Sequence, residues 1–254
     1  MPKLKLVHPR RPATGGRTES VKNLTTRGRT KRVKNLTGSV RPQMVKPLTG
    51  SARPPVMAKI DYKKSLPEVY GARRAPAEVR VPGGTFLAVD GVGEPGDAAF
   101  QEAMHQLFTL AYTTRFTMKK AGGVDFTVPA LECVYLDNPC EKGRREWHWR
   151  VMVRVPPCVK APTLREVRKA IAAKKGPATD AVKRITWAEG KALQLLHVGP
   201  YDQVGTAYQR LADETAARGL QVVGPAHEIY LNDPRRVAPE RLKTIVRMAV
   251  KKGR

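Results

Sequence analysis

Two glutamates lie at similar positions in the two segments of this 254-residue chain that are most alike. Glu132 lies in residues 129–136 (PALECVYL), and Glu228 lies in residues 225–231 (PAHEIYL). Each segment has the composition of a strand and is followed by Asp, Asn and Pro, which is typical of a turn. Two glutamates that lie close together, or in an apolar pocket, would have a raised pKa in at least one of them, which suits proton transfer or cation binding. The alternative is that both are ordinary residues of a solvated sheet face.

Side chains alternate along a strand, so His227, Ile229 and Leu231 share one face while Glu228 and Tyr230 share the other. We expect the apolar Ile229 and Leu231 to face the helices, which leaves Glu228 and Tyr230 on the open side. Glu132 is expected at the equivalent place in the first half. We interpret His227 as a hydrogen-bonded histidine beside the core and give it no catalytic role.

Three further aromatic residues are candidates for contact with a ligand. Trp147 and Trp149 are two residues apart, so both indoles lie on one face of their strand. They would either line a pocket for a flat aromatic molecule or belong to the core. Tyr201 follows Gly199 and Pro200 at a strand-to-helix turn, where its phenol would either reach a cleft or cap the turn.

The elements that carry these residues repeat in two halves, each with the order strand, helix, strand, strand. Apolar patterns predict strands at 85–89, 129–136, 147–155, 192–198, 225–231 and 242–250, and helices at 97–112, 163–174 and 203–218. Asp97 is the expected N-cap of the first helix, and Gly219 the C-terminal stop of the last. The apolar stripe of the last helix consists of Val204, Ala207, Tyr208 and Leu211. One or two further strands are expected, near Tyr62 or Val79.

This order predicts an α+β domain with helices laid on an antiparallel sheet. A pseudo-twofold axis would relate the halves, and a central cleft between related copies is a favoured ligand site.

The net charge of +25 is unevenly distributed along the chain. Residues 1–56 contain 14 Lys and Arg but one acid, Glu19, so about half of the net charge lies in the first fifth. This segment has no aromatic residue and repeats short units, such as VKNLT, so we expect a disordered basic low-complexity extension before a folded domain at 57–254. It would be a weak nucleic-acid contact, a solvated linker, or a product of start-codon choice, with translation beginning at Met57.

Several classes of protein are disfavoured. No run of 18 apolar residues predicts a membrane span, and the N-terminus lacks the apolar stretch of a secretory signal. The three cysteines form no C-x-x-C pair, so we expect a cytoplasmic protein without structural metal. Phosphate-loop, G-x-S-x-G and H-E-x-x-H motifs are all missing.

Several blocks of this sequence resemble the GyrI-like small-molecule-binding family, in particular its stand-alone members. The resemblance covers roughly residues 57–251 and rests on YKK at 62–64, PEVY at 67–70, EWHW at 146–149, GPYD at 199–202, HEIYLNDPRR at 227–236 and APERLKT at 238–244. It implies a duplicated antiparallel fold with a central ligand cleft and a buried glutamate, here Glu228. Where many relatives have an aromatic pair after the first-half glutamate, this chain has Cys133 and Val134.

The resemblance also implies hydrolysis of electrophilic, cyclopropane-bearing (cyclopropanoid) DNA-alkylating compounds, which would be a detoxifying activity without a cofactor. Glu228 would act as general base on water, and Tyr230 or Tyr201 would stabilise the phenolate that forms. Trp147 and Trp149 would stack on the ligand, with Glu132 as a polar partner. The alternative is a non-catalytic binder or sensor of planar or cationic drugs. A nucleic-acid-associated protein is a third hypothesis, based on the basic extension.

Overall fold

The structure is a computed structural model that describes residues 59–137 and 146–253. The predicted extension at 1–56 and Cys140 lie outside the described residues. The described part contains an eight-stranded, fully antiparallel sheet in the order β1-β6-β8-β7-β3-β4-β2-β5. Its strands are β1 (Ala77–Val81), β2 (Gly84–Val92), β3 (Leu131–Tyr135), β4 (His148–Val155), β5 (Lys183–Trp187), β6 (Gly190–Val198), β7 (Leu220–Tyr230) and β8 (Lys243–Lys252).

The sheet is built from two halves that exchange their edge strands. In the first half, β2, β4 and β3 are neighbours, and in the second half, β6, β8 and β7 are neighbours in the matching order. The halves meet where β3 pairs with β7. However, β1 precedes β2 in the chain and pairs with β6, whereas β5 precedes β6 and pairs with β2. The predicted duplicated α+β fold is therefore confirmed, with one additional strand for each half.

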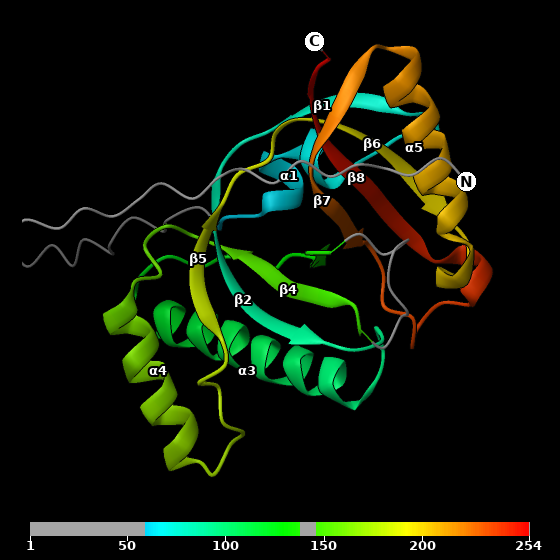
Figure 1. The fold of residues 1–254 in the computed structure, drawn as a ribbon. Coiled ribbons are helices and arrows are strands. Elements are labelled where there is room, and N and C mark those ends of the chain that lie inside the picture. Colours follow the sequence, from blue (N-terminus) through cyan, green and yellow to red (C-terminus); the bar gives the residue numbers. More distant parts are fainter. Residues whose placement is uncertain (1–58, 138–145, 254) are drawn as a thin grey trace, which may run out of the picture. The chain divides into compact units, whose positions relative to one another are not determined.

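The three longer helices are α3 (Ala98–Lys120), α4 (Ala161–Ala173) and α5 (Gly205–Ala217). Of these, α3 and α5 lie against the sheet and α4 packs against α3. Figure 1 shows α3 and α4 along the first half and α5 along the second. As predicted, the Asp97 side chain caps α3, accepting a hydrogen bond from the Phe100 amide at 2.8 Å. Gly219 follows α5 with a φ of 61°, a conformation that glycine adopts without strain.

Both faces of the sheet are covered. On the face that we call the front, Leu87, Val151, Leu193 and Val246 are buried in the clusters that contain α3 and α5. On the opposite, back face, Val79, Ile229 and Ile245 pack against Val69 and Tyr70. Tyr70 ends the short helix α2 (Pro67–Tyr70), which follows α1 (Tyr62–Ser65).

All six strands and three helices predicted from the sequence are present in the described residues, with some changes at their ends. The helix predicted at 97–112 extends to Lys120, and the extra strand expected near Val79 is β1. Tyr62 begins a helix rather than a strand. Strand β7 begins earlier than predicted, at Leu220, and its pairing with β8 shifts between Val222 and Ala226 at a β-bulge.

One expectation about the sheet faces is wrong. Ile229 and Leu231 do not face the long helices, because they belong to the back-face cluster that contains Tyr70. Glu228 and Tyr230 instead point to the front, where Tyr230 packs against the cluster that contains α3. Alternation shows correctly which side chains share a face, but a sheet that is buried on both sides gives no apolar signal that separates the faces.

No helix in the described ranges is long and apolar enough to cross a membrane.

Candidate functional site

A cleft of about 2130 Å³ lies on the front face, lined by residues of α3, α5, β3 and β7. Ligand pockets of drug-sized molecules usually measure about 300–1,000 Å³, so this cleft is large and open. Its walls are rich in aromatic side chains, among them Phe108, Tyr112, Tyr135, Trp147, Tyr201 and Tyr230. The expected central cleft is therefore present between the elements of the two halves.

Glu228 lines this cleft from the middle of the sheet and is only 4% exposed. One of its carboxylate oxygens, Oε1, accepts a hydrogen bond from the Tyr208 hydroxyl of α5 at 2.8 Å. Burial raises the pKa of Glu228, while hydrogen bonds from Tyr208 and Tyr230 and the charge of His227 act in the opposite direction. No Lys, Arg or His in the described part of the chain forms an ion pair with this carboxylate. Glu228 is thus a buried base that is held by phenols.

The tyrosines around Glu228 form a connected group. The hydroxyls of Tyr135 and Tyr230 are 3.2 Å apart, and the ring of Tyr201 meets that of Tyr230 edge-on at 5.4 Å. Burial and the charge of Glu228 raise the pKa of Tyr208 and Tyr230 well above the ordinary value. These phenols therefore stay protonated at neutral pH and can donate hydrogen bonds to a carboxylate or to an oxyanion.

The two tryptophans have different environments. Trp147 lines the cleft and contacts the Tyr135 ring edge-on at 5.5 Å. Trp149 is 1% exposed and packs edge-on against Phe100 at 5.0 Å, so it belongs to the core. The expectation that both indoles reach a ligand thus fits Trp147, and the alternative of a core residue fits Trp149.

Glu132 does not share the cleft with Glu228, which corrects the expected pairing of the glutamates. In the β3–β7 register, Glu228 lies opposite Cys133, whereas Glu132 lies opposite Ile229. Directly opposed side chains in an antiparallel pair share a face, so Glu132 points to the back. The two segments are similar in sequence, but aligning Glu132 with Glu228 misplaces one of them by one residue, which reverses its face.

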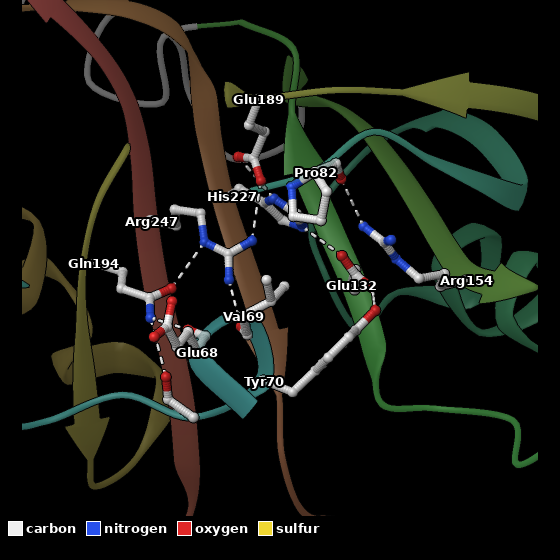
Figure 2. Close-up of polar contacts among 11 residues, drawn as sticks. Glu68, Val69, Tyr70, Pro82, Glu132, Arg154, Glu189, Gln194, His227 and Arg247 are labelled. Atoms are coloured by element: carbon white, nitrogen blue, oxygen red, sulfur yellow. Dashed lines mark hydrogen bonds and ion pairs between the residues drawn. The ribbon is translucent and has the colours of Figure 1, made fainter. Parts of the chain in front are cut away.

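On the back face, Glu132 belongs to a buried cluster of charged groups (Figure 2). The Tyr70 hydroxyl donates to Glu132 at 2.7 Å, and His227 Nε2 lies 3.2 Å from the other Glu132 oxygen. His227 Nδ1 lies 3.0 Å from Glu189, whose second oxygen accepts a hydrogen bond from Arg247 at 3.0 Å. The imidazole N–H bonds are not well aligned with these oxygens, so the histidine contacts are ion pairs rather than well-formed hydrogen bonds.

The charges of this back-face cluster fix its protonation. Burial alone would lower the pKa of His227, but Glu189 and Glu132 raise it to about 9. Burial alone would raise the pKa of Glu189, but His227 and Arg247 lower it to about 2. His227 is therefore an imidazolium at neutral pH, in agreement with its interpretation as a satisfied histidine beside the core.

Sequence reasoning located four of the cleft residues, Glu228, Tyr230, Trp147 and Tyr201, and missed others. Tyr208 was assigned only to the apolar stripe of its helix, although a phenol in such a stripe signals a buried hydrogen bond. Glu189 and Arg247 gave no signal, because their contacts with His227 and Gln194 join residues that are distant in the sequence and leave no local pattern. The described residues include no group of His, Cys, Asp and Glu that could hold a metal ion.

The fold and the cleft define a small-molecule-binding domain. Residues 75–251 match the family described as GyrI-like small molecule binding domain, and this chain belongs to that family. It is similar to the crystal structure of a hydrolase encoded by lin2189 from Listeria innocua, with 32% identity and a TM-score of 0.71 over 76% of this chain and 100% of that chain. A second structure, of an uncharacterized conserved protein from Listeria innocua, is 33% identical with a TM-score of 0.72 and the same coverage. No curated protein matches this chain.

Proposed function

We propose that this protein binds flat aromatic small molecules in the front-face cleft and hydrolyses those that carry an electrophilic cyclopropane. The observation that carries the proposal is a buried carboxylate, Glu228, without an ion-pair partner among the described residues, at the floor of an aromatic cleft. Two similar structures of 32% and 33% identity are described as hydrolases from Listeria innocua, which supports a hydrolytic activity.

Glu228 acts as the general base. Burial raises its pKa, which strengthens its basicity relative to an exposed carboxylate. In a spirocyclopropyl dienone, the water oxygen bonds to the cyclopropane methylene carbon as Glu228 takes the water proton. The carbon–carbon bond of the small ring breaks, and its electron pair moves into the dienone, which becomes a phenolate. A proton returned to that phenolate completes the addition of one water molecule.

The tyrosines of the cleft stabilise the developing phenolate. Tyr230 lies beside Glu228 on the front face, and the ring of Tyr201 contacts the ring of Tyr230. Their hydroxyls are protonated donors, and donors that are fixed before the reaction stabilise charge as it appears. Trp147 supplies a flat indole against which an aromatic ligand can stack. Neither Glu132 nor Trp149 contributes, because one points to the back and the other lies in the core.

The proposal is tested by incubating the full-length protein with a duocarmycin-type spirocyclopropyl compound and following the products by mass spectrometry. We expect a product that has gained one water, formed at least 100-fold more slowly by Glu228→Gln. Glu240→Gln, which changes an exposed glutamate that does not line the cleft, is the matched control and should retain full activity. Equal turnover by Glu228→Gln and wild type would overturn the role of Glu228.

A second candidate function is non-catalytic binding of planar cations. It is favoured by the same unpaired carboxylate, because a cationic ligand would supply the charge partner that the described residues do not. If the compound is retained unchanged and Glu228→Gln weakens binding of aromatic cations but not of neutral analogues of the same shape, this function replaces the first.

A further inference from the structure

In the part of the chain that the structure describes, Glu228 receives hydrogen bonds from its own side of the sheet but forms no ion pair there. The titratable groups that face it are phenols, a thiol and one rim carboxylate, contributed by β3, β7, α5, the Tyr201–Gln203 turn and the loop after β7. They are Cys133, Tyr135, Tyr201, Tyr208, Tyr230 and Asp233. None of these side chains is cationic, and the basic residues that line the cleft elsewhere, Lys63, His105 and Arg235, form no ion pair with Glu228. A carboxylate in such surroundings lacks a counter-charge.

Among the described residues, the positive charge that acts on Glu228 comes from the adjacent residue, His227, on the other face of the sheet. His227 precedes Glu228 in β7, so its imidazole points to the back face. Its side chain is 1% exposed and lies between two carboxylates, 3.2 Å from Glu132 and 3.0 Å from Glu189. The histidine is thus held in the charged form by groups that do not touch the cleft.

The remainder of the cluster keeps this arrangement in place. Arg247 of β8 lies directly opposite His227 of β7. Two like charges at such a position would repel each other. Glu189 bridges them, with one oxygen on each residue at 3.0 Å. Arg247 also donates to Gln194 and to the Val69 carbonyl, so its position is fixed on several sides (Figure 2).

We propose that His227 is a positioning residue for the cleft, which supplies through the sheet the positive charge that keeps Glu228 available as a carboxylate. Glu132 and Glu189 hold the imidazolium in place, and their own negative charges oppose its effect on Glu228. The inference rests on the proposed function, because it takes Glu228 as the functional carboxylate of the cleft. It concerns the charge of Glu228 and not the reaction that Glu228 performs.

This proposal predicts opposite effects from two substitutions in one cluster. His227→Gln removes the positive charge that lowers the pKa of Glu228, so it should raise the midpoint at which Glu228 ionises by about one pH unit. Glu132→Gln removes a negative charge while Glu189 still holds His227, so it should lower the midpoint. A purely structural disturbance would not shift the Glu228 midpoint in opposite directions according to the sign of the charge that is removed.

The experiment measures the infrared absorption of the Glu228 carboxyl in the full-length protein as a function of pH. Each variant is compared with the same variant carrying Glu228→Gln, so that the difference isolates this one carboxyl group. Tyr70→Phe is the matched control, because it removes the hydrogen bond to Glu132 at 2.7 Å without changing any charge. It should leave the midpoint unchanged.

Midpoints that shift in the same direction in His227→Gln and Glu132→Gln, or that do not shift, would overturn the proposal. If His227→Gln does not fold, the comparison of Glu132→Gln with Tyr70→Phe still tests the proposal. Only Glu132→Gln changes a charge, so only this variant should lower the Glu228 midpoint. The proposed hydrolysis can fail while these shifts are observed, and hydrolysis that depends on Glu228 can occur without them, so the two proposals fail separately. Where turnover is measurable, the pH profile of kcat/KM should follow the same shifts.

Discussion

At the scale of single residues, the cleft is defined by a carboxylate that folding places in an unfavourable environment. Glu228 is 4% exposed and is held by the Tyr208 hydroxyl, and burial raises its pKa. Such a group binds its proton more tightly in the folded protein than in the unfolded chain. Proteins retain buried ionisable groups of this kind at functional sites, where a perturbed pKa serves chemistry.

Glu228→Gln should therefore stabilise the protein at high pH and have little effect at low pH. The folded-state pKa is raised, so wild type loses stability as the pH rises from the ordinary carboxyl pKa through the folded value, and the glutamine variant does not. Each unit of the shift corresponds to about 1.4 kcal/mol above both pKa values. Urea unfolding at pH 4 and pH 9 measures the difference, with Glu240→Gln as the exposed control. A glutamine variant that is less stable than wild type at pH 9 would contradict this assignment.

The two tryptophans should separate binding from stability. Trp149 is 1% exposed against Phe100, so Trp149→Ala should lower the free energy of unfolding by about 3–5 kcal/mol. Trp147 lines the cleft, so Trp147→Ala should weaken binding of a fluorescent planar ligand by about tenfold with a smaller loss of stability. Thermal unfolding and ligand titration of both variants test this. The assignment fails if Trp149→Ala has the weaker effect on unfolding.

At this scale, the pairing register between strands could not be predicted from the sequence. Alternation correctly placed Glu228 and Tyr230 together, because the rule is local to one strand. Glu132 was placed on the wrong face, because its relation to Glu228 depends on how β3 pairs with β7, and a shift of one residue reverses the face. Contacts such as Tyr208 to Glu228 join a helix and a strand and leave no local pattern to read.

At the scale of elements, α3 and α5 form the walls of the cleft, and close packing on the sheet sets the position of α3. Gly91 in β2 lies under Trp149, where an added Cβ would come within 2.2 Å of the indole ring. The ring can therefore pack between the sheet and Phe100 only because β2 has a glycine at this point.

Gly91→Ala should lower the free energy of unfolding by about 1–3 kcal/mol, because the indole must move out of a filled core. Gly205 begins α5, and no atom lies within 4 Å of the position that its Cβ would take. Gly205→Ala should leave stability unchanged or raise it by about 0.5 kcal/mol, because alanine loses less backbone entropy in a helix. Equal destabilisation by both substitutions in urea unfolding would show that β2 does not set the packing of Trp149.

The edge strand β5 shows what the sequence pattern could not supply for the elements. Strand β5 has only partly buried apolar residues, and the chain before β6 gave no strong alternation. Its partner, β2, lies in the other half of the chain, about 100 residues away. Such non-local pairing is decided by the completed sheet and not by the composition of the segment.

At the scale of the whole described domain, the exchange of β1 and β5 makes the halves interdependent. Cutting the chain after α4, at residue 173, would separate β1 from β6, β2 from β5 and β3 from β7. Each fragment would keep exposed strand edges and half of the back-face cluster, so neither is expected to fold alone. Mixed fragments should regain near-ultraviolet circular dichroism and a cooperative unfolding transition. Cooperative unfolding of either fragment by itself would contradict this dependence.

The central claim, that Glu228 activates water in the cleft, is tested most directly by running the reaction in heavy-oxygen water. Wild-type protein and a spirocyclopropyl dienone should give a ring-opened product with one heavy oxygen on the former cyclopropane carbon, and Glu228→Gln should form it at least 100-fold more slowly. A product without the label, or labelled product formed equally fast by both proteins, would contradict the account.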